Sequence, residues 1–557
     1  MPTKPLLTLT LYIALFVARP STDQAQTGTA DYVQTLQKAE RLMKDQNWSE
    51  AGPLWEQLTA KNPLVGEYWS QQGRAWYQAK EYRKSIPAYE KALDLRDGFP
   101  FNSAYNIACC YGLLGDKAKA MEWLEKSFKL GWRDLQHART DDDLKLLRDD
   151  PKFREMTAMV DTSKMSRDEG WRYDLHLLWR ELKRLHYDLR RRTDLAEFES
   201  FLKRVDADIP KLSDNQVMAK LMQLAQMAGD GHTGIRPSHQ NRPGIPIQPY
   251  QFTEGIFITA TAPEQADLLG SQILKVGEHD VTEIAKSLAP VISRDNSTGL
   301  LSTAPALLRR PTLLNGLNLI PDAGKETITI KDREGKVREI TLDAVNNEPS
   351  ESWSLLSKTS SNPLPLYLKN RKAPYWFEYL PDQKTVFFQY NEVRSDLKDP
   401  LDKFCDRLFK FIGDNDVRKL VLDLRWNGGG NTFLNQPIIH GLIKCDKINQ
   451  KGKLFVIVGR QTFSAAQNCA TFIERNTNAL FVGEPTGSSP NFVGESVKIM
   501  LPYSKMEGSI SDLYWQSSRP MDYRTWIAPD LYAPPTFELY KQNRDPAMEA
   551  ILTYPAT

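Results

Sequence analysis

The sequence has few cysteines, a net charge near zero and no pair of cysteines at the spacing of a metal site. Each of these absences excludes a class of protein. Five cysteines in 557 residues are too few for a disulfide framework. No two of them have the CxxC spacing of a zinc or redox site. The 72 basic and 70 acidic side chains leave a net charge of +2, so no field of one sign attracts nucleic acid or an anionic membrane. We therefore expect no structural zinc site and no nucleic-acid partner.

The sequence also lacks a long apolar run after its first residues. A helix needs roughly 20 apolar residues to span a bilayer. The stretch from Leu6 to Ala18 has only 13 residues, follows Lys4 and precedes a polar segment. This pattern is typical of a secretory signal cleaved between Ala18 and Thr27, and the alternative is a buried N-terminal helix. We expect an exported protein, periplasmic or secreted, with no stable membrane insertion.

A repeat of 34 or 35 residues occupies the first third of the chain. Four columns of residues recur three times each, namely Ala39, Gly73 and Ala108; Ala51, Ser85 and Ala120; Trp55, Tyr89 and Leu124; and Leu58, Ala92 and Ser127. The period is that of tetratricopeptide repeats, in which small residues let two helices pack closely. The segment from Asp141 to Phe153 is predicted to be a capping helix. Such an array either serves as a scaffold or dimerisation element, or holds a peptide or partner protein in its groove.

The helical pattern that follows ends at a loop rich in glycine. Helical periodicity runs from Trp171 to Met227, and the loop from Gly229 to Gly234 then presents His232. Glycine neighbours leave the imidazole unobstructed by other side chains. A single histidine is usually structural, so the loop alone leaves a structural and a catalytic role open.

Short strands are predicted after this loop. They lie at residues 255–259 and 272–276, and a helix near 284–288 and a hairpin at 327–342 follow them. This order resembles a PDZ-type module, which binds extended chain ends by strand addition. An insertion at residues 309–321 interrupts the resemblance.

The last third of the chain predicts an α/β core. Apolar strands at 420–424, 454–458 and 479–482 alternate with helices at 434–443 and 465–475. Continuous apolar strands of this kind are buried on both faces, which favours a parallel sheet with right-handed crossovers.

Unusual loops follow the first two of these strands. The first strand leads to a glycine loop at 427–431, and the second leads to Ser464 at the start of a helix. Open sheets place their sites at the carboxyl ends of strands. A serine at a helix start with glycine amides nearby can supply a nucleophile and an oxyanion hole. The alternative is that Ser464 caps the helix and the glycines form a turn.

Four motifs together resemble the tail-specific (C-terminal-processing) protease family. They are Asp423 to Gly430, Thr462 to Ala466, Gly483 to Gly487, and Pro529-Asp530, in the family's order and spacing. The resemblance covers roughly residues 170 to 545. It implies a Clp/crotonase-like α/β core, here with a PDZ-like β module and preceded by an all-α tetratricopeptide repeat array.

The resemblance also implies roles for individual residues. One branch of the family uses a serine–lysine dyad, but position 489 is serine here, and Lys498 lies in a strand-like run. The tricorn-like branch uses a histidine from an upstream loop, which His232 matches. In that branch Ser464 is the nucleophile, His232 the base, and an acidic residue, here Asp522, orients the imidazole.

The resemblance further implies an oxyanion hole and a class of substrate. The N–H groups of Gly429 and Ala465 are implied to bind the oxyanion, while Gln467 stands where many members carry glutamate. Neither a metal nor a cofactor is needed. The sequence thus predicts an exported serine peptidase acting on a peptide or protein, with a possible protein partner in the repeat groove. The alternative is a non-catalytic protein- or ligand-binding protein on the same fold, since the family includes retinoid-binding members.

The predicted organisation therefore has five parts. They are a signal peptide at 1–26, tetratricopeptide repeats with a capping helix at 27–160, a helical segment ending in the Asp-Gly-His-Thr loop at 161–235, a PDZ-like module at 240–350, and an α/β serine-hydrolase core at 370–545.

Overall fold

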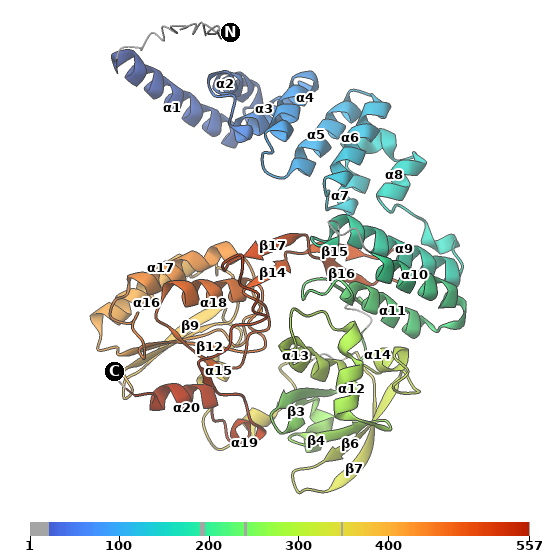
Figure 1. Cartoon of the computed structure of the whole chain (residues 1–557), viewed down its shortest axis with the longest axis vertical. Helices are drawn as coiled ribbons and strands as arrows, with labels where there is room; N and C mark the ends of the chain where they lie inside the picture. The colour runs from blue at the N-terminus through green and yellow to red at the C-terminus, as the bar shows by residue number, and fades with distance from the viewer. Residues whose placement is uncertain (1–21, 190–194, 239–241, 347–348, 556–557) are drawn as a thin grey trace, which may run out of the picture. The chain divides into compact units, whose positions relative to one another are not determined.

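The chain forms two compact units, which divide between Met159 and Val160. The computed structural model describes residues 22–189, 195–238, 242–346 and 349–555 (Figure 1). Residues 1–21 of the predicted signal peptide lie outside the described residues. None of the helices described in these ranges is long and apolar enough to cross a membrane.

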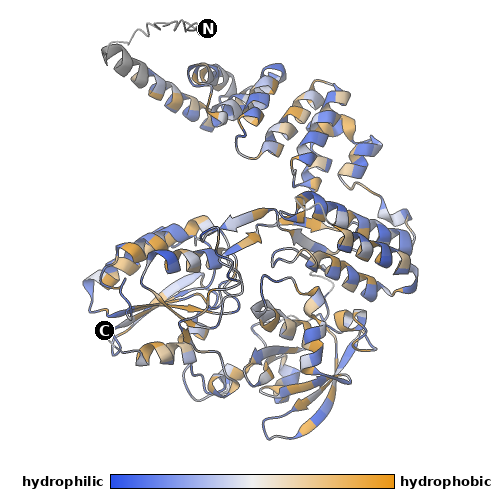
Figure 2. Ribbon diagram, in the orientation of Figure 1, coloured by the Kyte–Doolittle hydropathy of each residue, from blue (hydrophilic) through white to orange (hydrophobic). Residues whose placement is uncertain are grey.

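The first unit is built from antiparallel helix pairs. Its helices are α1 (Thr22–Lys44), α2 (Trp48–Lys61), α3 (Gly66–Gln78), α4 (Tyr82–Asp94), α5 (Pro100–Leu113), α6 (Lys117–Lys129), α7 (Leu135–Thr140), η1 (Asp142–Leu147) and α8 (Pro151–Met156). All four predicted columns of repeat residues are buried between the helices. A Cβ on Gly73 would lie 2.8 Å from the ring of Tyr89, so the close approach of α3 and α4 requires glycine. Figure 2 shows hydrophobic and hydrophilic residues mixed along the repeat helices, as expected for helices with one buried face.

The predicted capping helix is wrong in detail. Residues 141–153 form the 3₁₀ helix η1 and the start of α8 rather than one helix. Asp141 caps η1 by accepting the N–H of Asp143, and Pro151 begins α8. Leu144 and Phe153 are nonetheless fully buried, so the segment still covers the end of the apolar core.

The second unit begins with helices that lead to a small sheet. The helices are α9 (Arg167–Leu185), α10 (Ala196–Asp208) and α11 (Asp214–Gln226). The sheet has the order β1-β16-β15, from β1 (Gly234–Arg236), β16 (Glu507–Ile510) and β15 (Val497–Met500). Strand β1 directly follows the Asp-Gly-His-Thr loop and pairs antiparallel with β16. This pairing joins the loop to a segment more than 270 residues later.

A second sheet follows along the chain. Its elements are β2 (Ile247–Phe252), β3 (Gly255–Thr261), β4 (Gln272–Val276), β5 (His279–Asp280), α12 (Val281–Ser287), α13 (Thr298–Leu307), α14 (Pro311–Gly316), β6 (Lys325–Lys331), β7 (Val337–Asp343) and β8 (Ser354–Leu355). The order is β2-β3-β4-β6-β7, with β5 against β4 and β8 against β3. The predicted strands and hairpin correspond to β3, β4, β6 and β7, and the predicted insertion contains α14. Strand β2 was not predicted, and the PDZ-like identity of this sheet stays a prediction.

The α/β core is a sheet of order β18-β13-β12-β11-β10-β9. It contains β9 (Tyr375–Leu380), β10 (Thr385–Tyr390), α16 (Leu401–Asp414), β11 (Lys419–Asp423), α17 (Gln436–Lys444), β12 (Leu454–Val458), α18 (Ala465–Asn476), β13 (Leu480–Gly483), β18 (Leu531–Tyr532) and α20 (Pro546–Thr553). Strands β10 to β13 and β18 pair in parallel, and β9 pairs antiparallel with β10. Helices α16, α17 and α18 cover one face and α20 the other (Figure 1).

Shorter elements connect the core to its surroundings. They are α15 (Leu366–Lys369), η8 (Leu356–Lys358), η9 (Thr432–Asn435), α19 (Phe537–Tyr540), and the antiparallel pair β14 (Asn491–Gly494) and β17 (Leu513–Gln516). The predicted apolar strands thus occupy the centre of the core sheet as β11, β12 and β13. The glycine loop follows β11 and Ser464 follows β12, so both lie at the carboxyl edge of the parallel core sheet.

Candidate active site

Ser464 stands at the N-terminus of α18 in a strained backbone conformation. Its φ is 53° and its ψ is −125°, in a region that a residue with a Cβ rarely adopts. Its side chain makes no capping hydrogen bond to α18, so the alternative role of a simple helix cap is not what the structure shows. Strain of this kind, with the hydroxyl left free of the helix, is typical of a serine that a sharp strand–helix turn presents to a substrate.

The loop before Ser464 is held by hydrogen bonds to the glycine loop. Thr462 Oγ1 donates to the carbonyl of Leu424 at 2.9 Å, and the N–H of Phe463 donates to the carbonyl of Asn427 at 3.1 Å. Asn427 is fully buried, and its Nδ2 donates to the carbonyl of Tyr390 at 2.9 Å. Asn427 therefore fixes the distance between the two loops that the sequence placed at neighbouring strand ends.

Gly429 lies directly against the serine. A Cβ at this glycine would lie 2.7 Å from Ser464 Cβ and 2.9 Å from the nitrogen of Ala465, and its φ is 109°. Both the space and the conformation therefore require glycine. The N–H of Gly429, however, donates to Asn427 Oδ1 at 2.9 Å, whereas the N–H of Ala465 has no partner among the described residues. Of the two predicted oxyanion donors, only Ala465 is free in this structure.

His232 lies beside the serine turn between two aromatic rings. Its ring stacks on Phe463 with centroids 4.5 Å apart and on Phe492 with centroids 5.5 Å apart. Neither ring nitrogen has a hydrogen-bond partner within the described part of the chain, and both are buried. Burial lowers the pKa of His232 to about 4, although the nearby Asp230 acts in the opposite direction. The imidazole is therefore neutral near pH 7 and available to accept a proton, but it is not hydrogen-bonded to Ser464.

Two carboxylates hold the loop that carries His232. Asp230 Oδ1 accepts the backbone N–H of His232 and of Thr233, each at 2.8 Å, and its Oδ2 is 2.8 Å from His186 Nε2. Two backbone N–H groups donate to His186 Nδ1, so the ring proton lies on Nε2 and donates to Asp230. Burial alone would raise the pKa of Asp230, but the hydrogen bonds from His186 and Ser511 outweigh it and lower the pKa to about 2.

Asp295 is the second carboxylate at this loop, and sequence reasoning missed it. Its Oδ1 accepts the N–H of Gly231 at 2.6 Å, and its Oδ2 accepts the hydroxyl of Ser488. Burial raises the pKa of Asp295 to about 6, against the lowering effect of those two hydrogen bonds. The residue comes from the segment before α13, which no motif marks. Only the fold brings it between the histidine loop and the loop after β13.

Asp522 does not reach the histidine. Its carboxylate accepts Ser518 Oγ at 2.6 Å and Arg524 Nε at 2.9 Å, and Arg524 also pairs with Glu474 at 2.7 Å. The hydrogen bond from Arg524 holds the pKa of Asp522 well below its usual range. The predicted hydrogen bond to His232 is thus absent, because the carboxylate of Asp522 is already hydrogen-bonded to Ser518 and Arg524, its neighbours in the sequence.

Lys498 and Ser489, the positions that bear on a serine–lysine dyad, have other surroundings than Ser464. Lys498 is exposed on β15, where its partner across the sheet is Ser509. Ser489 Oγ donates to the carbonyl of Thr525 at 3.1 Å. Gln467, at the position of the family's glutamate, is fully buried, and its Nε2 donates to Thr471 Oγ1 at 3.2 Å. None of these side chains offers a base to Ser464.

One cluster in the first unit has the donor types of a metal site. Cys109 Sγ and carboxylate oxygens of Asp141 and Asp143 lie within 4.8 Å of one another. The tyrosine hydroxyls of Tyr105 and Tyr77 donate to these two carboxylates. Both acids are thereby satisfied as hydrogen-bond acceptors between helices, which accounts for the cluster without an ion.

Comparison with known proteins agrees with this architecture. The tetratricopeptide repeat family model matches residues 101–130, which span α5 and α6. No curated protein matches the chain. Among solved structures, mature CPAF complexed with lactacystin is similar over 69% of this chain and 97% of that chain, with 12% identity and a TM-score of 0.50. This likeness shows a shared fold.

Two further solved structures are also similar. The photosystem II D1 C-terminal processing protease is 12% identical over 69% of this chain and 96% of that chain, with a TM-score of 0.34. The tricorn protease is 12% identical over 71% of this chain and 37% of that chain, with a TM-score of 0.34. The likeness to CPAF is the one that shows the fold predicted from the four motifs, and the helical repeats precede it in the sequence.

Proposed function

We propose that the chain is an exported serine peptidase that hydrolyses peptide bonds by acyl transfer through Ser464. The observation that carries the proposal is the backbone of Ser464, which is held at φ 53° with its hydroxyl free of the helix it precedes. Strain is retained where the surrounding structure enforces it, and Asn427 and Gly429 enforce it here. The motif resemblance and the fold shared with CPAF support the same assignment.

The reaction follows from the positions of three groups. Ser464 Oγ attacks the carbonyl carbon of the substrate while its proton passes to a ring nitrogen of His232. The oxyanion that forms accepts the N–H of Ala465, at the positive end of the α18 dipole. The proton then passes to the leaving amine, and water repeats the sequence on the acyl-enzyme with His232 again as base.

His232 has to turn toward Ser464 for this reaction. In this structure its ring nitrogens are buried and unpartnered beside Phe463 and Phe492. Hydrogen bonds between catalytic groups are often formed only when substrate binds. We infer that substrate displaces one of the two aromatic rings and lets the imidazole approach the hydroxyl.

The unpartnered ring nitrogens of His232 also favour a second candidate, a non-catalytic binding protein on this fold. Without the turn of His232, neither candidate base that the motifs offer, His232 or the exposed Lys498 on β15, is hydrogen-bonded to Ser464 among the described residues. Labelling with a fluorophosphonate separates the two candidates. The peptidase predicts labelling of the wild type that Ser464→Ala abolishes and His232→Ala strongly reduces. Absence of labelling, together with no cleavage of a peptide library, would establish the binding protein instead.

The repeats of the first unit fit a role in presenting protein. Tetratricopeptide arrays present a concave surface to peptides. We propose that this unit holds a protein partner or a substrate segment for the second unit, and that the leader at residues 1–26 directs export. Deletion of the repeats is expected to lower cleavage of a protein substrate while fluorophosphonate labelling of Ser464 is retained.

A further inference from the structure

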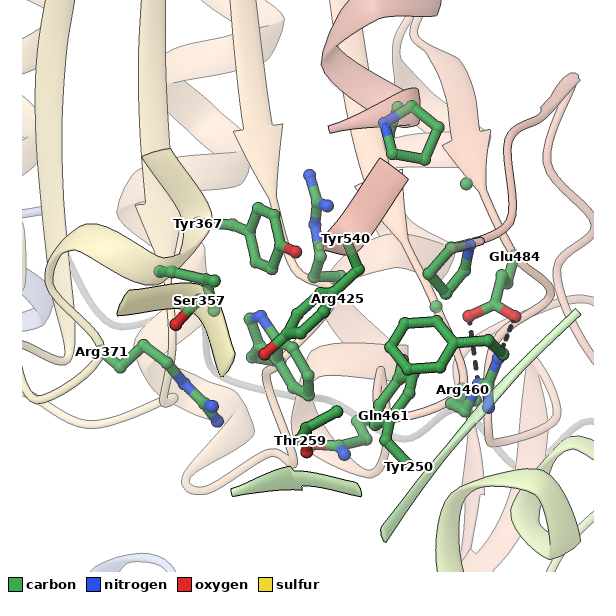
Figure 3. Close-up of a pocket in the computed structure, with 18 of the residues that line it drawn as sticks. Tyr250, Thr259, Ser357, Tyr367, Arg371, Arg425, Arg460, Gln461, Glu484 and Tyr540 are labelled. Atoms are coloured by element: carbon green, nitrogen blue, oxygen red, sulfur yellow. Dashed lines mark hydrogen bonds and ion pairs between the residues drawn. The ribbon is translucent and has the colours of Figure 1, made fainter. Parts of the chain in front are cut away.

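A cavity of about 670 Å³ lies between the second sheet and the carboxyl ends of the core strands (Figure 3). Residues of β2, β3, η8 and α15 form one wall, and the loops after β11, β12 and β13 form the other. Neither Ser464 nor His232 lines the cavity, and no residue of α12 does. Its volume is in the range of sites that enclose a small organic molecule.

The charges around the cavity are strongly unbalanced. Its lining includes the cations Lys358, Lys369, Arg371, Arg425, Arg460 and Arg544, against Glu484 as the sole acid in the described lining. Four of the cations already have acidic partners, namely Lys369 with Glu378, Arg425 with Asp423 and Asp545, Arg460 with Glu484, and Arg544 with Glu549. The positive charge that is left belongs to Lys358 and Arg371.

Arg371 has no anionic partner in the part of the chain that the structure describes. Its guanidinium lies 4.3 Å from the ring centroid of Trp426, and it makes no hydrogen bond or ion pair with any described residue. Arg371 is exposed, and the atoms packed around its guanidinium lower its pKa only from an already high usual range, so the group stays charged. Because Arg371 is exposed, lines the cavity and has no described partner, its guanidinium is accessible to an anionic group of a ligand in the cavity.

Aromatic side chains fill the space around this cation. Tyr250, Tyr367 and Tyr540 line the cavity, and Figure 3 shows them between Arg371 and the Arg460–Glu484 pair. The hydroxyls of Tyr250 and Tyr367 have no hydrogen-bond partner in the described ranges. The wall therefore combines apolar ring surface with spare hydrogen-bond donors.

We propose that this cavity binds a small carboxylic acid with an aliphatic or aromatic body. The carboxylate pairs with Arg371, whose planar guanidinium matches the two carboxylate oxygens. The body of the ligand lies against Trp426 and the three tyrosine rings. The proposal does not rest on the peptidase activity, because the cavity and the Ser464 site have no lining residue in common.

Isothermal titration of the full chain with octanoate and 3-phenylpropanoate tests the proposal, with the primary amide of each acid as its uncharged match. We expect each acid to bind at least about tenfold more tightly than its amide. Arg371→Gln is expected to abolish this preference, and Arg371→Lys to retain part of it. Lys372→Gln, one residue beyond and outside the lining, is the matched control and is expected to keep the full preference.

Three results would overturn the proposal. They are equal binding of acid and amide by the wild type, an unchanged preference in Arg371→Gln, and binding only of peptides with a free C-terminus. A thermal melt of each variant shows whether it is folded. Ser464→Ala is expected to bind the acids as the wild type does, so a failure of the peptidase proposal leaves this test intact.

Discussion

The ring of His232 stacks on Phe463 with centroids 4.5 Å apart. The two residues lie 231 positions apart in the sequence, and Phe463 immediately precedes Ser464. The contact therefore brings His232, the proposed base, to the turn that carries Ser464, the proposed nucleophile. It also holds the imidazole in a stack in which neither ring nitrogen has a hydrogen-bond partner among the described residues.

The close contacts at Gly429 predict that substitution by alanine has a much larger effect at Gly429 than at its neighbour Gly428. Gly429→Ala is expected to lower the fluorophosphonate labelling rate more than about 100-fold and stability by roughly 1–3 kcal/mol, because the new methyl would meet Ser464 and Ala465. Gly428→Ala is the control, since a Cβ there meets no atom within 4 Å. Similar losses in both variants would contradict this steric explanation.

The acidity of His232 predicts the low-pH limit of labelling. Its pKa of about 4 means that the imidazole stays neutral well below pH 6. The labelling rate is expected to fall by half near pH 4, where protonation removes the base, and not near 6.5 as for an ordinary histidine. A stopped-flow labelling profile from pH 3.5 to 8 measures this limit. A midpoint near 6.5 would mean that the ring is solvated before reaction.

Asp295 predicts a stability change of defined sign. Its carboxyl has a pKa of about 6 in the folded chain, above the ordinary 3.8, because burial disfavours the charge. The stabilisation that the protonated group provides is therefore complete below pH 3.8 and is lost as pH rises to 6. Asp295→Asn cannot ionise, so relative to the wild type it should gain about 2 kcal/mol between pH 4 and pH 7.

Urea unfolding of both proteins at pH 4, 5.5 and 7 measures this gain. The folded pKa of His232 is lowered, so its own contribution has the opposite sign and is lost as pH falls from 6.5 toward 4. Both proteins carry His232, and the comparison cancels its effect. A difference in stability that does not vary with pH would contradict the assigned acidity of Asp295.

Asp230 holds the His232 loop, whereas Asp522 pairs with Arg524. Changing each acid to asparagine is therefore expected to affect the labelling rate differently. Asp522→Asn is expected to change the labelling rate less than about threefold, because its carboxylate contacts Ser518 and Arg524 and not His232. Asp230→Asn is expected to lower the rate at least about tenfold, because Asp230 accepts the backbone N–H of His232. The reverse order would restore Asp522 to the role that the motif resemblance implies.

Periodicity and apolar runs were sufficient to predict most of the fold. The repeat columns are buried because each holds a small or apolar residue at a fixed interval, and β11 to β13 are continuous apolar strands. The capping segment was mispredicted because Asp141 and Pro151 interrupt it locally. Strand β1 is too short for a pattern, and it forms by pairing with β16 from the far end of the chain.

The site was predictable only where a motif carries its chemistry. The Ser464 turn and the His232 loop have local signatures, and they do lie together. Asp295 has none, because its role comes from two long-range hydrogen bonds, to Gly231 and Ser488. Spacing from Pro529 suggested Asp522, but spacing does not show that Arg524 occupies its carboxylate.

The most direct test of the central claim is to locate the fluorophosphonate adduct by mass spectrometry. Cleavage after Arg460 and Arg475 releases residues 461–475, in which Ser464 is the single serine. We expect one adduct, on this peptide, in the wild type and in the control Ser489→Ala, and none in Ser464→Ala. An adduct on any other peptide, or no adduct in a folded wild-type chain, would contradict this claim.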